Sequence, residues 1–170
     1  MIIFFIFLTI NYYKGILKLI KIINYYKFND YKIIINSKLK LPKFEFDFKF
    51  ININDELDAL NFAIHYFDIC DNAFIIKING NCTLKYNSPF IKAIYDNNNN
   101  NNYDIISKYF FSDLIGIRCG LIKMIDKNKD IHIQLRYEKL KSIVNDNKLL
   151  YLDYLGIDIS QIRNNIYTIY

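Results

Sequence analysis

The stretch Phe74-Ile-Ile-Lys-Ile-Asn-Gly-Asn-Cys-Thr-Leu-Lys-Tyr86 contains the clearest structural signal in the sequence. Two runs of strand-forming residues, 74–78 and 82–86, flank the dipeptide Asn79-Gly80. Both residues of an Asn-Gly pair readily adopt the positive φ angles that a tight two-residue turn requires. The pattern therefore predicts a β-hairpin in the middle of the chain.

The residues before this stretch predict a strand and then a helix. Phenylalanines occupy alternate positions over residues 44–50, with charged residues between them, which is the period of a half-buried strand. Asn54 can cap a following helix that ends near Asp71, and the acids Asp55 and Glu56 favour its N-terminal turn. An acidic catalytic cluster is the alternative interpretation of these acids, and the helix start explains them better.

The residues after the hairpin predict further strands and helices that alternate in groups. The expected elements are a strand at 90–95, a poly-Asn surface loop at 97–102, a helix at 103–119, strands at 121–125, 131–137 and 149–155, and a last helix from Asp158 or Ser160. This order of strands, helix, strands and helix indicates two similar units in tandem.

The expected fold class is α+β, with two tandem small units of antiparallel sheet plus helix. The first unit covers residues 44–118 and contains the poly-Asn loop 97–102, and the second covers residues 119–170. Residues 1–43 are expected to form a basic, amphipathic helical arm in front of them. In this arm Lys14, Lys18 and Lys21 share one helical face.

Positive charge is concentrated in the arm. The chain carries a net charge of +5, and residues 1–43 hold eight lysines and one acid, Asp30, for a net charge of +7. The remaining residues, with 14 basic and 16 acidic side chains, have a net charge of −2. A cationic arm indicates a polyanionic partner, either nucleic acid or an anionic membrane surface. The apolar run Ile2–Leu8 is too short to span a bilayer, which needs about 20 residues.

Composition narrows the source and the compartment. Ile, Asn, Lys, Tyr and Phe are abundant, Pro occurs twice and Trp is absent, a bias typical of an A/T-rich genome. The three cysteines are widely spaced and form no Cys-x-x-Cys pair, which favours a reducing compartment over a disulfide framework.

The sequence contains no nucleotide-binding glycine motif and no combination of nucleophile and base typical of an enzyme. Zinc held by His65, His132 and a cysteine is conceivable, but the ligands lack the close pairing of metal sites. We therefore expect no catalytic residues, no metal, no cofactor and no small-molecule substrate. The three arginines, Arg118, Arg136 and Arg163, are either phosphate clamps or solvent-facing charges.

Four stretches resemble large-subunit ribosomal protein six, an internally duplicated α+β protein. They are Phe74–Tyr86, Leu114-Ile-Gly-Ile-Arg-Cys-Gly-Leu-Ile-Lys123, Ile133–Leu140 and Gly156-Ile-Asp158, in the order that the family has them. The similarity covers about residues 73–170. It implies a non-catalytic protein that binds large-subunit rRNA.

The resulting hypothesis is a structural constituent of an organellar large ribosomal subunit. A ribosome in the mitochondrial matrix is expected, with a plastid possible, and the partners are large-subunit rRNA and neighbouring ribosomal proteins. The alternative is a membrane-attached accessory subunit of a respiratory or ATP-synthase complex, in contact with the membrane through the arm. The candidate rRNA-binding residues are Lys14, Lys18, Lys21, Lys27, Lys32, Lys38, Lys40, Lys43, Arg118, Arg136 and Arg163.

Overall fold

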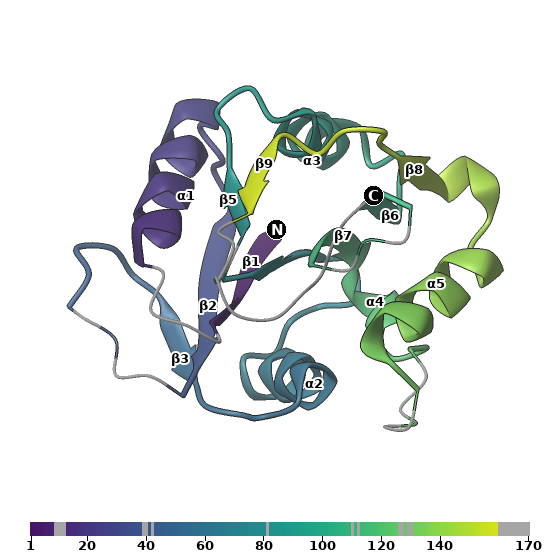
Figure 1. Cartoon of the computed structure of the whole chain (residues 1–170), viewed down its shortest axis with the longest axis horizontal. Coiled ribbons are helices and arrows are strands. Elements are labelled where there is room, and N and C mark those ends of the chain that lie inside the picture. Colours follow the sequence, from purple (N-terminus) through teal and green to yellow (C-terminus); the bar gives the residue numbers. More distant parts are fainter. Residues whose placement is uncertain are drawn as a thin grey trace.

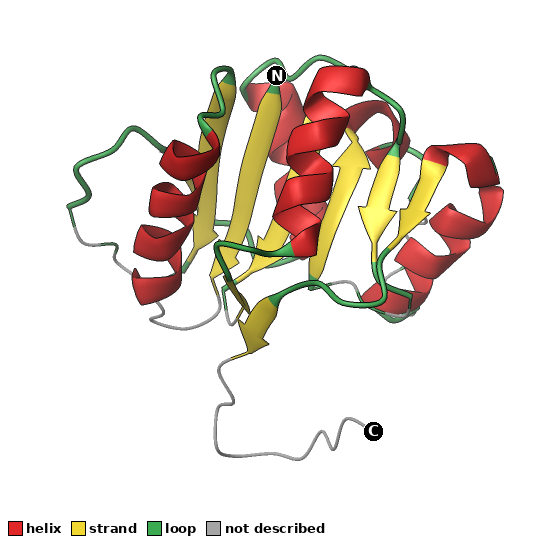
Figure 2. Ribbon diagram, turned by 90° about the horizontal axis from the view of Figure 1, so that it is seen from above, coloured by secondary structure: helices red, strands yellow, loops and turns green. Residues whose placement is uncertain are grey.

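The computed structural model describes residues 1–8, 13–38, 41, 43–80, 82–109, 111, 113–125, 128 and 131–159. Within them, a seven-stranded sheet forms the centre of a mixed α and β architecture with five α-helices (Figures 1 and 2). The strands of this sheet are β1 (Ile2–Leu8), β2 (Tyr31–Ser37), β3 (Lys49–Ile51), β4 (Phe74–Asn79), β6 (Ile105–Ser107), β7 (Leu114–Arg118) and β8 (Leu149–Tyr151).

The helices cover both faces of the sheet (Figure 1). One face packs against α1 (Tyr13–Tyr26) and α3 (Pro89–Asn100). The opposite face packs against α2 (Glu56–Tyr66), α4 (Cys119–Ile122) and α5 (Ile133–Ile143), and we call it the α2/α5 face. A short 3₁₀ turn, η1, spans Asp146–Lys148. Two further strands, β5 (Cys82–Leu84) and β9 (Ile157–Ile159), pair with each other in a separate small sheet.

The strand order is β3-β2-β1-β4-β7-β6-β8. Strands β1 to β4 run parallel to one another, and β7 runs antiparallel to both β4 and β6. The chain thus moves from β1 outward to β2 and β3, and then returns to place β4 on the other side of β1. The two halves diverge between β1 and β4, which is the topological switch point of a doubly wound sheet.

Strand β1 is buried in the middle of this sheet. Phe4 and Ile6 pack into the core beside α1 and α3, whereas Ile3 and Phe5 pack into the core under α2 and α5. A strand covered by helices on both faces needs apolar side chains at every position, not at alternate ones. The unbroken apolar run of Ile2–Leu8 meets that requirement.

The expected N-terminal arm is not confirmed. Residues 1–43 contribute β1, α1 and β2, and β1 pairs with β2 and β4 at the centre of the sheet. The helical part of the expectation is confirmed, because α1 is a helix whose residues Lys14 and Lys21 are exposed. Among the described residues, none of the helices combines the length and the hydrophobicity needed to cross a bilayer.

The expected hairpin at residues 74–86 is wrong in its pairing, although both strands exist. Strand β4 pairs with β1 and β7, and β5 pairs with β9. Gly80 does not close a turn between β4 and β5; its N–H donates to the Phe7 carbonyl oxygen at 2.8 Å. Strand β4 is flanked by β1 on one side and by β7 on the other, so it has no free edge with which β5 could pair.

Over much of the second half of the chain, the structure has helices where the sequence predicted strands, and strands where it predicted a helix. The segment expected as a strand at 90–95 lies in α3, which begins with Ser88 as its N-cap and Pro89 in its first turn. The poly-Asn segment is partly helical, since α3 continues to Asn100 and Asn101 caps it with a φ of 54°. Residues 103–119, expected as a helix, contain β6 and β7, whereas 121–125 and 131–137, expected as strands, overlap α4 and α5.

The two tandem units are not confirmed either. Strands β3, β4, β6 and β7 of 44–118 and strand β8 of 119–170 belong to the same sheet as β1 and β2, and β5 of the first expected unit pairs with β9 of the second. Of the strand expected at 149–155, only Leu149–Tyr151 is a strand, β8. Over 44–50, only Lys49 and Phe50 are in a strand. The Phe44 ring stacks on that of Phe46 and meets that of Phe48 edge-on. The expected last helix is wrong at Asp158, which lies in β9, and its remaining residues from Ser160 lie outside the described residues.

Candidate functional site

Polar side chains replace apolar ones where the central strands end on the α2/α5 face. Phe7 of β1 lies beside Asn36 of β2 and Asn79 of β4 in the sheet register. Asp113 precedes β7 and lies next to Asn79, whose N–H donates to the Asp113 carbonyl oxygen at 2.8 Å. We call these four residues, Asn36, Phe7, Asn79 and Asp113, the edge row. The first three lie near the ends of the parallel strands β2, β1 and β4, and Asp113 immediately precedes the neighbouring strand β7. All four thus lie at the carboxyl edge of the parallel part of the sheet.

Two members of the edge row are bonded directly to each other. The Asn79 Nδ2 donates to Asp113 Oδ1 at 2.5 Å, while the buried Asn79 Oδ1 has no partner within the described structure. A buried acceptor without a donor costs about 1–3 kcal/mol. This pair therefore holds an ordered carboxylate next to a buried hydrogen-bond acceptor that lacks a donor.

Asn36 positions the start of α2 over the same edge. Its Nδ2 donates to the Ile53 carbonyl oxygen and its Oδ1 accepts from the Ile53 N–H, both at 2.9 Å. Two residues later, Asp55 caps α2 by accepting from the N–H groups of Leu57 and Asp58. The interpretation of Asp55 as a helix-start residue is confirmed, with the cap one residue later than the expected Asn54.

A buried ion pair lies one step below the edge row. The Lys77 side chain on β4 is only 1% exposed, and its Nζ lies 2.9 Å from Oε2 of Glu56 on α2. Tyr137 of α5 donates its hydroxyl proton to Glu56 Oε1 at 3.1 Å, and its ring centroid lies 5.4 Å from the Lys77 Nζ. Burial, with the Glu56 charge second, raises the pKa of Tyr137 well above its usual value. We call these three residues the Lys77–Glu56–Tyr137 network.

This network joins the three elements that surround the edge row. Its residues come from the sheet, from the first turn of α2 and from the middle of α5. A buried charge is stable only with a well-placed partner, so the network fixes both helices relative to β4. The network therefore ties α2 and α5 to the sheet next to the candidate site.

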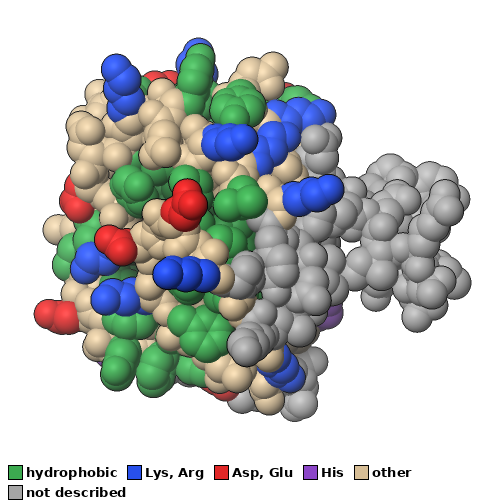
Figure 3. Space-filling model, turned by 90° about the vertical axis from the view of Figure 1, so that its left-hand side faces the viewer, with side chains coloured by type: hydrophobic (Ala, Val, Ile, Leu, Met, Phe, Trp, Pro, Cys, Tyr) green, Lys and Arg blue, Asp and Glu red, His purple; other side chains and the backbone are tan. Residues whose placement is uncertain are grey.

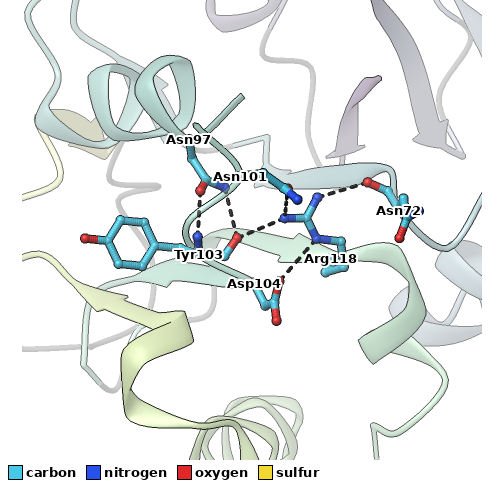
Figure 4. Close-up of polar contacts among 6 residues, drawn as sticks. All are labelled: Asn72, Asn97, Asn101, Tyr103, Asp104 and Arg118. Atoms are coloured by element: carbon cyan, nitrogen blue, oxygen red, sulfur yellow. Dashed lines mark hydrogen bonds and ion pairs between the residues drawn. The ribbon is translucent and has the colours of Figure 1, made fainter. Parts of the chain in front are cut away.

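Arg118, a candidate phosphate clamp, lies at the opposite, amino edge of β4 (Figure 4). Its Nε is 3.3 Å from Asp104 Oδ1, one Nη donates to the Asn72 carbonyl oxygen at 2.9 Å, and the other Nη donates to Asn101 Oδ1 and the Tyr103 carbonyl oxygen. The guanidinium therefore connects β7 to the end of α3 and to the loop before β4. A cavity of about 110 Å³ lies beside it.

The other arginines and the lysines are distributed over the molecule. Arg136 is buried on α5, where its Nε donates to the Ile131 carbonyl oxygen at 2.8 Å. Lys40 and Arg163 lie outside the described residues. Of the remaining candidate rRNA-binding residues, six are exposed, namely Lys14, Lys21, Lys27, Lys32, Lys38 and Lys43, and Lys18 is half-buried. Lys14, Lys18 and Lys21 lie on α1, whereas the register of β2 places Lys32 on the α2/α5 face.

The two histidines lie on different helices, α2 and the start of α5. His132 caps α5 by accepting from the Gln134 N–H, and His65 is exposed on α2. Burial raises the pKa of the Cys82 thiol to about 12 and that of Cys119 to about 11, so neither is a reactive thiolate at neutral pH. In the part of the chain that the structure describes, no three His, Cys, Asp or Glu side chains converge to hold a metal ion.

Sequence reasoning missed the edge row, although a signal for it exists. Two of the apolar strands end in Asn, in Asn36-Ser37 and in Asn79-Gly80. Parallel strands that end in polar residues indicate a site at their shared carboxyl edge. That signal can be interpreted only once β1, β2 and β4 are known to be parallel neighbours in the sheet.

Comparison of the chain with models of known protein families and with curated protein sequences finds no match.

Proposed function

We propose that this chain is an α/β domain that binds a small polar molecule at the carboxyl edge of β1 and β4, on the α2/α5 face. The edge row is the observation that carries the proposal. In open doubly wound sheets, ligands bind outside the carboxyl ends of the strands at the topological switch point. Here that point lies between β1 and β4, and the edge row crosses it.

The backbone at the end of β4 favours a ligand site on the α2/α5 face of this edge over a site on the α1 face. A Cβ on Gly80 would lie 2.6 Å from Leu8 Cδ2 and 3.3 Å from the Phe7 carbonyl oxygen. The chain after β4 thus packs directly against the end of β1. Polar groups instead collect on the α2/α5 face, where Asn79 and Asp113 are half-buried.

The charges of the site favour a ligand that donates hydrogen bonds. Asp113 supplies a carboxylate and Asn79 supplies a free acceptor oxygen, whereas the ammonium group of Lys77 is paired with Glu56. A carboxylate next to a carbonyl oxygen suits the vicinal hydroxyls of a sugar better than a phosphate group. We therefore propose the ribose of a nucleoside, or a related sugar, as the ligand.

Asp113→Asn should weaken the binding of such a ligand about 10- to 100-fold, because a hydrogen bond to a charged group contributes about 1.5–3 kcal/mol. A panel of adenosine, guanosine, uridine, cytidine and free sugars would be screened by saturation-transfer NMR, and the best ligand measured by calorimetry. Asp96→Asn, which removes an exposed acid of α3, is the matched control and should leave affinity unchanged.

Two outcomes would contradict this proposal. One is that no nucleoside or sugar of the panel binds the wild-type chain at millimolar concentration. The other is that Asp113→Asn and Asp96→Asn have the same effect on affinity while both variants keep the wild-type circular dichroism spectrum.

As a second candidate function, we propose that the protein is a structural constituent of an organellar large ribosomal subunit and binds its rRNA. The observation that favours it is the group of exposed lysines on and after α1, including Lys14, Lys21 and Lys32. If this function is correct, the protein sediments with large ribosomal particles and dissociates from them as salt is raised. Sedimentation with membranes that survives a high-salt wash would contradict it and favour the membrane-attached alternative.

A further inference from the structure

The exposed face of α1 carries three lysines and a tyrosine in one stripe. Lys14, Lys18, Lys21 and Tyr25 are separated by four, three and four residues, which places them along one side of the helix. At about 1.5 Å per residue, the stripe is about 16 Å long. We call these four residues the α1 stripe, and Figure 3 shows the side of the molecule on which α1 lies.

Charge along the stripe is of one sign. The sequence of α1, Tyr-Lys-Gly-Ile-Leu-Lys-Leu-Ile-Lys-Ile-Ile-Asn-Tyr-Tyr, contains no acidic residue. No ion pair of the described structure includes Lys14, Lys18 or Lys21. The opposite side of the helix packs into the core through Ile16, Ile22 and other buried apolar residues. The lysines are therefore available to a polyanion that lies along the helix.

Two exposed aromatic rings stand at the end of the stripe. Tyr25 is 68% exposed and Tyr86 is 43% exposed, and their ring centroids are 5.9 Å apart in an edge-to-face arrangement. The Tyr26 hydroxyl donates to the Tyr86 carbonyl oxygen at 3.0 Å, which fixes the loop of Tyr86 against α1. The rings are thus held in place while their surfaces remain open to a partner.

We propose that the α1 stripe and Tyr86 form a binding surface for single-stranded nucleic acid. Lysines hold the phosphates, and the tyrosine rings stack on the bases, which is how proteins bind single strands without sequence preference. Lysines alone would suit any polyanion; the rigid tyrosine pair favours bases over lipid headgroups. The proposal does not depend on the ligand site at the carboxyl edge, and it names the surface through which the second proposed function would operate.

The test is fluorescence anisotropy of a labelled 12-nucleotide oligo-dT at several salt concentrations, with the full chain. Each phosphate contact contributes about 0.7 to the slope of log affinity against log salt for a single strand. The triple variant Lys14→Gln, Lys18→Gln, Lys21→Gln should therefore reduce the slope by about 2 and weaken binding at least tenfold. Tyr25→Ala should weaken binding about 5- to 100-fold through lost stacking, and Tyr25→Phe should restore it.

The control has the same change of net charge at distant exposed lysines. It is the triple variant Lys108→Gln, Lys139→Gln, Lys148→Gln, and it should keep the wild-type slope. Asp113→Asn should also leave oligonucleotide binding unchanged. Any of three results would overturn the proposal: equal loss in the two triple variants, loss of oligonucleotide binding in Asp113→Asn, or binding to phosphatidylserine vesicles with none to the oligonucleotide.

Discussion

Phe4→Ala should lower the free energy of unfolding by about 3–5 kcal/mol, the range found for removal of a large buried ring. Phe4 is fully buried in the central strand β1. Its ring packs edge-on against Phe28 at 5.7 Å and Tyr31 at 6.2 Å between ring centroids. The substitution removes these contacts and opens a cavity between the sheet and α1. Urea denaturation followed by circular dichroism measures the loss.

The control is Leu17→Ala on the outer side of α1. Leu17 is 49% exposed, so its truncation should change the free energy of unfolding by no more than about 0.5 kcal/mol. Equal losses in Phe4→Ala and Leu17→Ala would mean that residues 1–8 lie outside the core, as an N-terminal arm would.

Glu56→Ala should destabilise the protein by about 3–5 kcal/mol, although Glu56 lies in the first turn of a surface helix. The substitution leaves the Lys77 ammonium, 1% exposed, without the carboxylate that lies 2.9 Å away, and it removes the acceptor of the Tyr137 hydroxyl. A buried charge without its partner is strongly unfavourable. The measurement is again urea denaturation at neutral pH.

The double variant Glu56→Leu, Lys77→Met separates lost pairing from lost packing. Apolar replacement of both charges is often neutral or stabilising, so this variant should recover most of the loss. Glu45→Ala, at an exposed position before β3, should change stability by no more than about 0.5 kcal/mol. If Glu56→Ala is no more destabilising than Glu45→Ala, the Lys77–Glu56–Tyr137 network does not hold α2 to the sheet.

Local signals in the sequence were sufficient where one element decides its own structure. The helix α2 follows from its capping acid and its apolar stripe, and α1 follows from the lysine spacing over residues 14–21. Strand β4 follows from the run of β-branched residues at 74–78. In each of these cases the pattern within the segment itself is enough to predict the element.

The strand pairing could not be read from the sequence, because it depends on residues far apart in the chain. The Asn79-Gly80 dipeptide is locally suited to a hairpin, yet β4 is buried between β1 and β7. Burial on both faces of a sheet also removes the alternation that distinguishes a strand from a helix. Ile2–Leu8 is the clearest case, since its continuous apolar run fits a central strand as well as a membrane contact.

The abundance of isoleucine explains why helices and strands were mistaken for each other in the second half of the chain. Ile105, Ile106 and Ile117 lie in strands, although the apolar spacing over 103–119 also fits a helix. Ser88-Pro89 and His132 begin helices that were expected to be strands, and their capping role was overlooked. The ribosomal resemblance implied two tandem units, which are not confirmed, and the lysines of α1 lie outside the residues 73–170 that the resemblance covers.

The candidate site was beyond sequence reasoning for a similar reason. Glu56 was correctly placed at the start of a helix, but its partner Lys77 lies in a separate segment, which the sequence predicted only as one strand of a hairpin. Asn36, Asn79 and Asp113 come from three separate segments that only the parallel sheet brings together. A site built from strand ends becomes visible only after the strand order is known.

Amide hydrogen exchange of β1 tests the central claim, that Ile2–Leu8 is the middle strand of a doubly wound sheet. If it is, the amides of Phe4, Phe5 and Ile6 exchange only through global unfolding and are among the slowest in the protein, together with those of β4. Exchange of these amides within seconds at neutral pH, while β4 remains protected, would show that the segment is a free arm and would contradict the fold and the ligand site built on it.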